Sequence, residues 1–126
     1  MDKLTEQWFA QSDYDLDTAE YMLKGGRCFY AVFMAHLAIE KALKGLWQAK
    51  LKASPPKTHN LLYLIEKLGV RVPEDTARFL TRLNDVSVLT RYPDDLQKLV
   101  TDFSEPVTGD LLKSSREVLT WIKAQR

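Results

Sequence analysis

The sequence predicts an all-helical domain, and three features of its pattern lead to that prediction. Apolar residues recur at steps of three and four over most of the 126 residues, a spacing that places them on one face of a helix. No segment alternates apolar and polar residues between hairpin turns, as a β-sheet would require. Gly-Gly and Pro-Pro pairs separate the periodic segments. The length suits one domain, so we expect a single domain over residues 1–126.

The first two helices are expected to be the longest. The apolar stripe of the first helix consists of Leu4, Trp8, Leu16, Ala19 and Leu23, and Gly25-Gly26 ends it. The second helix runs from about Cys28 to Leu51 and is apolar on nearly every side. Such a helix lies at the centre of a bundle or is shared with a partner chain.

Three further helices follow a break at residues 54–57, which read Ser-Pro-Pro-Lys. Thr58 is expected to cap a short third helix that Gly69 ends. A fourth helix starts at Pro73-Glu74-Asp75 and is broken over residues 90–95, because a proline at 93 disfavours helical angles at the residue before it. Residues 104–106 start the last helix, whose inward side is expected to carry Val107, Leu111, Val118 and Ile122.

Composition and charge exclude several classes of protein. Charged residues make up 28% of the chain, and the net charge is +1, which argues against a protein that coats DNA. The single cysteine, Cys28, rules out an intramolecular disulfide and fits a reducing compartment. No signal-peptide pattern is seen, and the longest apolar run is far shorter than the roughly 20 residues of a membrane span. We expect a cytoplasmic protein without a membrane partner.

Charge is distributed unevenly along the chain. Residues 1–20 hold six acidic residues and one lysine, whereas residues 41–65 hold five lysines and no acidic residue. Two interpretations stay open: the helices have complementary charged surfaces, or the lysines form a patch that faces an anion.

The second helix carries a polar stripe, in which His36, Glu40 and Lys44 are spaced by four residues and lie within roughly 80° of arc. The stripe could bind a polar ligand or do acid–base work, or it could be an ordinary Glu40–Lys44 pair beside a hydrogen-bonded histidine. His59 lies before the third helix and could bond a carbonyl or a carboxylate of another helix. Neither histidine has metal-ligand spacing, so we expect no metal and no cofactor.

Residues 91–95, Arg-Tyr-Pro-Asp-Asp, form the most distinctive short motif. Arg91 could clamp the helices structurally, or it could present its guanidinium to a phosphate. Walker A, GxGxxG, GxSxG and HExxH motifs are absent from the sequence.

Four fragments together resemble the HEPN domain family over almost the whole chain. They are Trp8 with the Asp15–Ala19 region, the segment from Tyr30 to Lys44 with its A-x-E-K-A-L-K pattern, Thr58-His59-Asn60-Leu61 and Thr90-Arg91-Tyr92-Pro93-Asp94. The resemblance implies an up-and-down bundle of about four long helices plus a short one, usually as a homodimer. It also implies a minimal nucleotidyltransferase as partner, in a toxin–antitoxin-like pair.

The resemblance leaves enzymatic activity open. Many HEPN proteins are metal-independent ribonucleases that use an arginine followed four to six residues later by a histidine. Here the matching arginine is Arg91, but the residues at 95–98 are Asp, Leu, Gln and Lys, so the ribonuclease motif is absent.

Three functional hypotheses follow. The first is a binding or accessory module for a nucleotide or nucleic-acid phosphate, with a ligand surface made of Glu40, Lys41, Lys44, Arg91, Tyr92 and Asp94. The second is a ribonuclease in which Arg91 stabilises the phosphorane charge and His36 or His59 is the base. The third is a structural, dimeric interaction protein in which the residue 91–95 motif only clamps helices.

Overall fold

A computed structural model describes residues 2–89 and 96–126, and this part of the chain contains six helices and no strand. The helices are α1 (Lys3–Lys24), α2 (Cys28–Leu51), α3 (Leu61–Leu68), α4 (Glu74–Leu89), α5 (Leu96–Asp102) and α6 (Glu105–Ala124). The all-helical prediction is therefore confirmed. Two short helices are present instead of one, because residues 96–102 form a helix that the sequence pattern did not predict.

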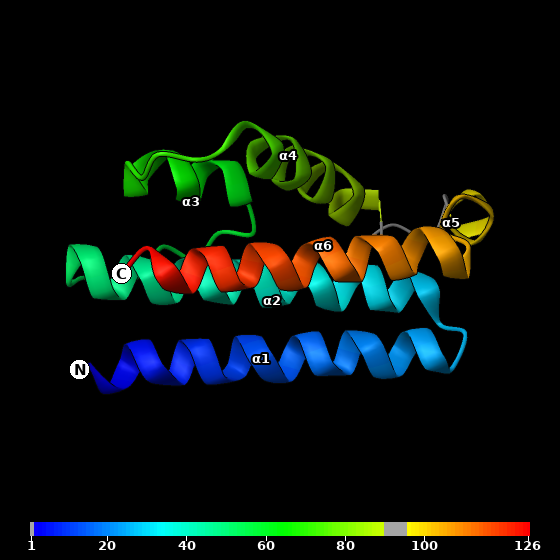
Figure 1. Ribbon diagram of the computed structural model, residues 1–126, viewed down its shortest axis with the longest axis horizontal. Coiled ribbons are helices and arrows are strands. Elements are labelled where there is room, and N and C mark those ends of the chain that lie inside the picture. Colours follow the sequence, from blue (N-terminus) through cyan, green and yellow to red (C-terminus); the bar gives the residue numbers. More distant parts are fainter. Residues whose placement is uncertain (1, 90–95) are drawn as a thin grey trace.

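The four long helices alternate in direction, as in an up-and-down bundle (Figure 1). α1, α2 and α6 lie side by side, and α3 and α4 lie over α2 and α6 as a second layer. α5 lies at the end of the bundle where α2 and α6 begin, and α1 begins and α6 ends at the opposite end. Among the described helices, none is long and apolar enough to cross a membrane.

α2 is the central helix and contacts each of the other five. Its fully buried side chains face all directions, and they include Val32, Ile39, Leu43 and Leu46. Small residues let the neighbouring helices approach closely. A Cβ added at Gly45 would lie 2.9 Å from the ring of Phe9. Its central place explains the all-round apolar character of α2 within a single chain.

Side-chain caps fix the starts of three helices. Asp2 caps α1, Asn60 caps α3 and Ser104 caps α6, each by accepting a hydrogen bond from a backbone N–H of the first turn. The prediction that Thr58 caps α3 is wrong. The Thr58 hydroxyl instead accepts a hydrogen bond from the backbone N–H of Asn60, the residue that does cap the helix.

The buried faces of α1 and α6 differ from the apolar stripes seen in the sequence. Leu4 is 52% exposed, while Thr5, Ser12 and Asp15 are buried against the core. The Ser12 hydroxyl donates to the carbonyl of Ala38 at 2.8 Å, which removes the cost of burying it. In α6, Val107 is 37% exposed and Thr108 is buried in its place.

Candidate functional site

The polar stripe of α2 lies inside the bundle. His36 is 0% exposed, Glu40 is 4% exposed and Lys44 is 8% exposed. The four-residue spacing brings the three side chains into one row, as the sequence predicted, but the row faces the interior and not solvent. Burying a carboxylate and an ammonium is costly unless they are paired, so their partners decide what this row can do.

The carboxylate of Glu40 lies at the centre of a cluster that also contains His36, Lys44 and His59. Its Oε2 accepts a hydrogen bond from Lys44 Nζ at 3.0 Å, and its Oε1 lies 2.9 Å from Nδ1 of His59. The Nδ1 atom of His36 lies 3.8 Å from the same Oε1. One carboxylate is thus surrounded by one lysine and two imidazoles. The predicted Glu40–Lys44 pair is present, and His59 bonds a carboxylate of another helix, as one interpretation of the sequence expected.

Hydrogen bonds fix the chain that follows His59. Asn60 accepts hydrogen bonds from the N–H groups of Leu62 and Tyr63 at 3.0 and 3.1 Å, and so fixes the start of α3. The Asn84 side chain, on α4, accepts a hydrogen bond from the N–H of Leu61 at 2.8 Å. α4 therefore fixes the residue after the α3 cap. The sequence did not predict this role of Asn84, because an asparagine inside a helix does not indicate which backbone N–H of another segment it will bond.

The imidazole of His59 is buried on one side and open on the other. Its side chain is 64% exposed, although its Nδ1 touches a carboxylate that is 5% exposed. Because a carboxylate only accepts hydrogen bonds, the Nδ1 atom must carry the proton of this bond. The second ring nitrogen is then left for a ligand. It is an acceptor in the neutral ring and a donor in the protonated ring.

Lys41 points away from this cluster. Its Nζ lies 2.7 Å from Oδ2 of Asp15 on α1, because adjacent residues on a helix are rotated by about 100° from each other. Lys41 thus joins α1 to α2. Arg91, Tyr92 and Asp94 lie outside the described residues, as does any contact between Arg91 and the two histidines.

The lysines of residues 41–65 divide into two groups. Lys41 and Lys44 are in the ion pairs above, whereas Lys50, Lys52 and Lys57 are exposed. Within the described residues, Lys52 and Lys57 form no ion pair, and Lys50 donates to the carbonyl of Gln125. We call Lys50, in the last turn of α2, together with Lys52, Lys57 and His59, which follow before α3, the basic segment.

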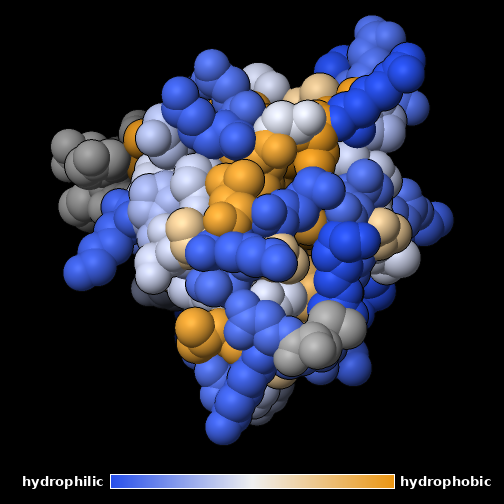
Figure 2. All heavy atoms as spheres, turned by 90° about the vertical axis from the view of Figure 1, so that its left-hand side faces the viewer, coloured by the Kyte–Doolittle hydropathy of each residue, from blue (hydrophilic) through white to orange (hydrophobic). Residues whose placement is uncertain are grey.

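The acidic residues of α1 are not the partners of the basic segment. Asp13 lies 2.6 Å from Lys123, and Asp17 and Glu20 each lie 3.5 Å from Arg116. These cations belong to α6, so charge complementarity acts between α1 and α6. Figure 2 shows the end of the molecule where α1 begins and α6 ends, and hydrophilic residues cover most of it around a narrow hydrophobic band.

Comparisons with known proteins give the family. The HEPN domain model matches residues 5–125. The chain belongs to the HEPN family. The protein TT1696 from Thermus thermophilus is similar in structure, with a TM-score of 0.83 and 26% sequence identity, over 97% of this chain and 98% of that chain. ST0689, described as an archaeal HEPN homologue, has a TM-score of 0.75 at 24% identity and 98% coverage of both chains. A search of curated proteins gives no match.

This HEPN bundle therefore places a carboxylate-held imidazole at the surface, on a connection between two helices. A buried carboxylate that fixes the orientation of a histidine is an arrangement that enzymes use to position a base, and binding sites use it to present a donor. No group of three or more His, Cys, Asp or Glu side chains within residues 2–89 and 96–126 is placed to hold a metal ion.

Proposed function

We propose that this HEPN chain is a binding module that holds a nucleotide or nucleic-acid phosphate at the basic segment. One observation supports the proposal above the others: buried Glu40 fixes His59 in place, while the rest of that imidazole stays open to solvent. Lys44 balances the charge of Glu40, so a phosphate that approaches His59 meets a carboxylate already paired with a cation.

The chemistry of the basic segment suits a phosphate. A protonated imidazole donates a charge-assisted hydrogen bond, and lysines act as mobile point charges near an anion. Lys52 and Lys57 are exposed and form no ion pair within the described residues, so no carboxylate there needs to be displaced before they bind an anion. Contacts of this kind position a nucleic acid without reading its sequence.

Charge reversal tests the proposal. We expect K52E/K57E to weaken binding of a fluorescently labelled single-stranded RNA by about tenfold or more at fixed salt, measured by anisotropy. The control is Lys113→Glu, which reverses an exposed lysine on α6 and leaves the basic segment intact. Equal affinity of the parent and the double variant would overturn the proposal.

Arg91, Tyr92 and Asp94 remain a predicted part of the ligand surface, and Arg91→Glu in the same assay tests them. Lys44 is unsuitable for charge reversal, because it is 8% exposed and a glutamate there would place a second carboxylate beside Glu40. A loss of affinity in Arg91→Glu without a change in melting temperature would support a direct contact.

A metal-independent ribonuclease is the second candidate function, favoured by the Glu40–His59 pair. In this proposal His59, oriented by Glu40, takes the proton of a ribose 2′-hydroxyl, whose oxygen attacks the adjacent phosphorus, and Arg91 stabilises the charge on the phosphorane. The P–O5′ bond then breaks, which leaves a 2′,3′-cyclic phosphate, and the leaving 5′-oxygen takes a proton from water. Incubation of parent, H59A and R91A proteins with cellular RNA and a chelator tests it. Cleavage by the parent and by neither variant would support an enzyme, and no cleavage by the parent would exclude this role.

Family resemblance supports two partners. We propose a homodimer and a minimal nucleotidyltransferase partner, in a toxin–antitoxin-like pair. The contacts of α2 within the chain account for its apolar faces, so the dimer rests on the family alone. Light scattering at micromolar concentration tests the dimer, because a mass near 14.5 kDa would exclude it. Co-purification with a nucleotidyltransferase encoded beside this chain tests the second partner.

A further inference from the structure

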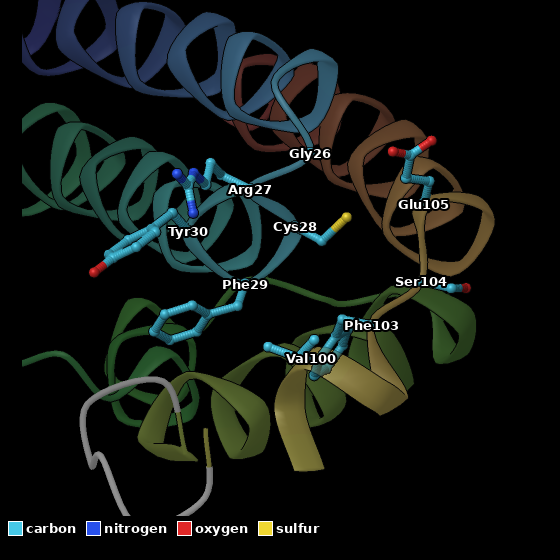
Figure 3. A pocket seen from close by; sticks show the side chains of 9 residues that line it. All are labelled: Gly26, Arg27, Cys28, Phe29, Tyr30, Val100, Phe103, Ser104 and Glu105. Atoms are coloured by element: carbon cyan, nitrogen blue, oxygen red, sulfur yellow. The ribbon is translucent and has the colours of Figure 1, made fainter. Parts of the chain in front are cut away.

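A pocket of about 520 Å³ lies between the start of α2 and the junction of α5 and α6 (Figure 3). This volume is typical of sites for small molecules, which range over roughly 300–1,000 Å³. The pocket is distinct from the basic segment, because Cys28 at its wall and Glu40 are 12 residues apart on α2, or roughly 18 Å along the helix axis.

The walls of the pocket are largely apolar and aromatic. Phe29 comes from α2, Val100 from α5, and Phe103 from the α5–α6 junction. Figure 3 shows the Val100 and Phe103 side chains on the α5 side of the pocket and Phe29 opposite them on α2. Val100 is 59% exposed and Tyr30, also at this pocket, is 52% exposed, so apolar surface remains in contact with solvent here. A planar ring would cover that surface.

Two charged residues line the same pocket. Arg27 is exposed, and it forms no ion pair with any described residue. It precedes the first turn of α2, where the helix dipole is positive and where no acidic residue is present. Glu105 lies in the first turn of α6, where that helix's dipole favours a carboxylate. Among the described residues that line the pocket, Arg27 is therefore a charge without a compensating partner, and an anion would supply one.

We propose that this pocket binds a small molecule in which a planar ring carries an anionic group. The ring lies against Phe29 and Val100, beside Phe103, which is 7% exposed, and the anionic group pairs with Arg27. Such ligands include nucleotides and aromatic carboxylates, which share this chemistry. The assignment is independent of phosphate binding at the basic segment.

Cys28 gives a direct readout, because it lines the pocket and is the only cysteine in the chain. The rate of its alkylation by the neutral reagent N-ethylmaleimide is measured by intact mass. The probes are AMP and naphthalene-2-carboxylate, and the neutral comparators are adenosine and naphthalene-2-carboxamide. We expect each anionic probe to slow alkylation at a concentration about tenfold lower than its neutral comparator requires. A tenfold difference in affinity is what one charge-assisted contact contributes.

Variants locate the site. Arg27→Glu removes the cation and leaves an acid that suits the start of a helix, and Val100→Glu places a negative charge on the pocket wall at an exposed position. Each is expected to raise the half-protecting concentration about tenfold or more. Two variants serve as controls. Arg71→Glu reverses the charge of an arginine that does not line the pocket, and Val100→Thr changes the same valine without adding a charge. Protection of Cys28 should persist in both.

The outcomes are distinguishable. Protection by AMP alone assigns a nucleotide, and protection by both anions assigns a broader aromatic-anion pocket, with either result supporting the proposal. Protection by neither anion, or protection that persists in both Arg27→Glu and Val100→Glu, would overturn it. Loss of RNA binding in K52E/K57E bears on the basic segment alone.

Discussion

At the scale of single residues, the Glu40 cluster is where charge and burial conflict. The side chains of Glu40 and Lys44 are 5% and 10% exposed and lose most of their hydration, and the 3.0 Å contact between their charged atoms offsets part of that loss. His59 adds a third member at the surface. Within the cluster, the buried pair holds the imidazole of His59, which is the member that is open to solvent.

Lys44→Met should be strongly destabilising. Methionine keeps the volume of the side chain but leaves the Glu40 carboxylate buried without its main cation, which costs about 3 kcal/mol in the free energy of unfolding. Urea denaturation measures it, with Lys113→Met as the exposed control. Adding Glu40→Gln to Lys44→Met should restore part of the loss. A change below about 1 kcal/mol would show that the pair is not needed.

Part of the Glu40 cluster could be predicted from the sequence, and the contact with His59 could not. The spacing of His36, Glu40 and Lys44 predicts one row on α2, and the structure contains it. The distance from His59 to Glu40 depends on how the connection between α2 and α3 folds back, and no periodicity records that path. The role of Arg91 stays a prediction, since it lies outside the described residues.

At the scale of elements, the packing of α1 on α2 depends on one glycine. A Cβ at Gly45 would lie 2.9 Å from the Phe9 ring, closer than Cβ atoms are found, and 3.0 Å from Trp8 Cβ, so both neighbours would have to shift. Gly109 on α6 is different, because the nearest atom to an added Cβ there is Leu23 Cδ2 at 3.9 Å. An alanine at Gly45 would therefore be crowded, whereas an alanine at Gly109 would fit.

Gly45→Ala and Gly109→Ala should therefore change stability in opposite directions. Overpacking at Gly45 costs about 1–3 kcal/mol, which exceeds the gain of up to about 1 kcal/mol from helix propensity. At Gly109 only the gain remains, so the melting temperature should rise. Thermal unfolding followed by circular dichroism compares them. A stabilised Gly45→Ala protein would contradict the close packing of α1 on α2.

The errors in predicting the elements have physical causes. The first helix was assigned an inward stripe that includes Leu4, but Thr5, Ser12 and Asp15 are buried because α2 supplies partners for Ser12 and Asp15. α5 was missed because its seven residues are too short to show a helical period. The bounds of α2 agree with the sequence, because no proline interrupts residues 28–51 and breaks at 25–26 and 54–57 flank them.

At the scale of the whole molecule, charge is divided between two tasks. Asp13, Asp17 and Glu20 of α1 pair with cations of α6, and within the described residues Lys52 and Lys57 of the basic segment form no ion pair. A net charge of +1 therefore conceals a local excess of positive charge between α2 and α3. Net charge alone argues against a DNA-coating protein but says nothing about such a segment.

The α1–α6 ion pairs should contribute little to stability. Arg116 is 48% exposed, and its partners Asp17 and Glu20 are 76% and 42% exposed, so solvent screens their attraction. Arg116→Ala should lower the free energy of unfolding by less than about 1 kcal/mol. Denaturation at low and high salt checks this, and a loss of several kcal/mol would mean that these pairs hold α6 in place.

The most direct test of phosphate binding at the basic segment is an NMR titration of the two histidine rings with a short single-stranded RNA. His59 is largely exposed beside Lys57, and His36 is fully buried, so the second ring is an internal control. We predict that the His59 ring signals shift in proportion to the bound fraction, with much smaller shifts at His36. Saturable RNA binding that leaves the His59 signals unmoved would contradict the proposed site.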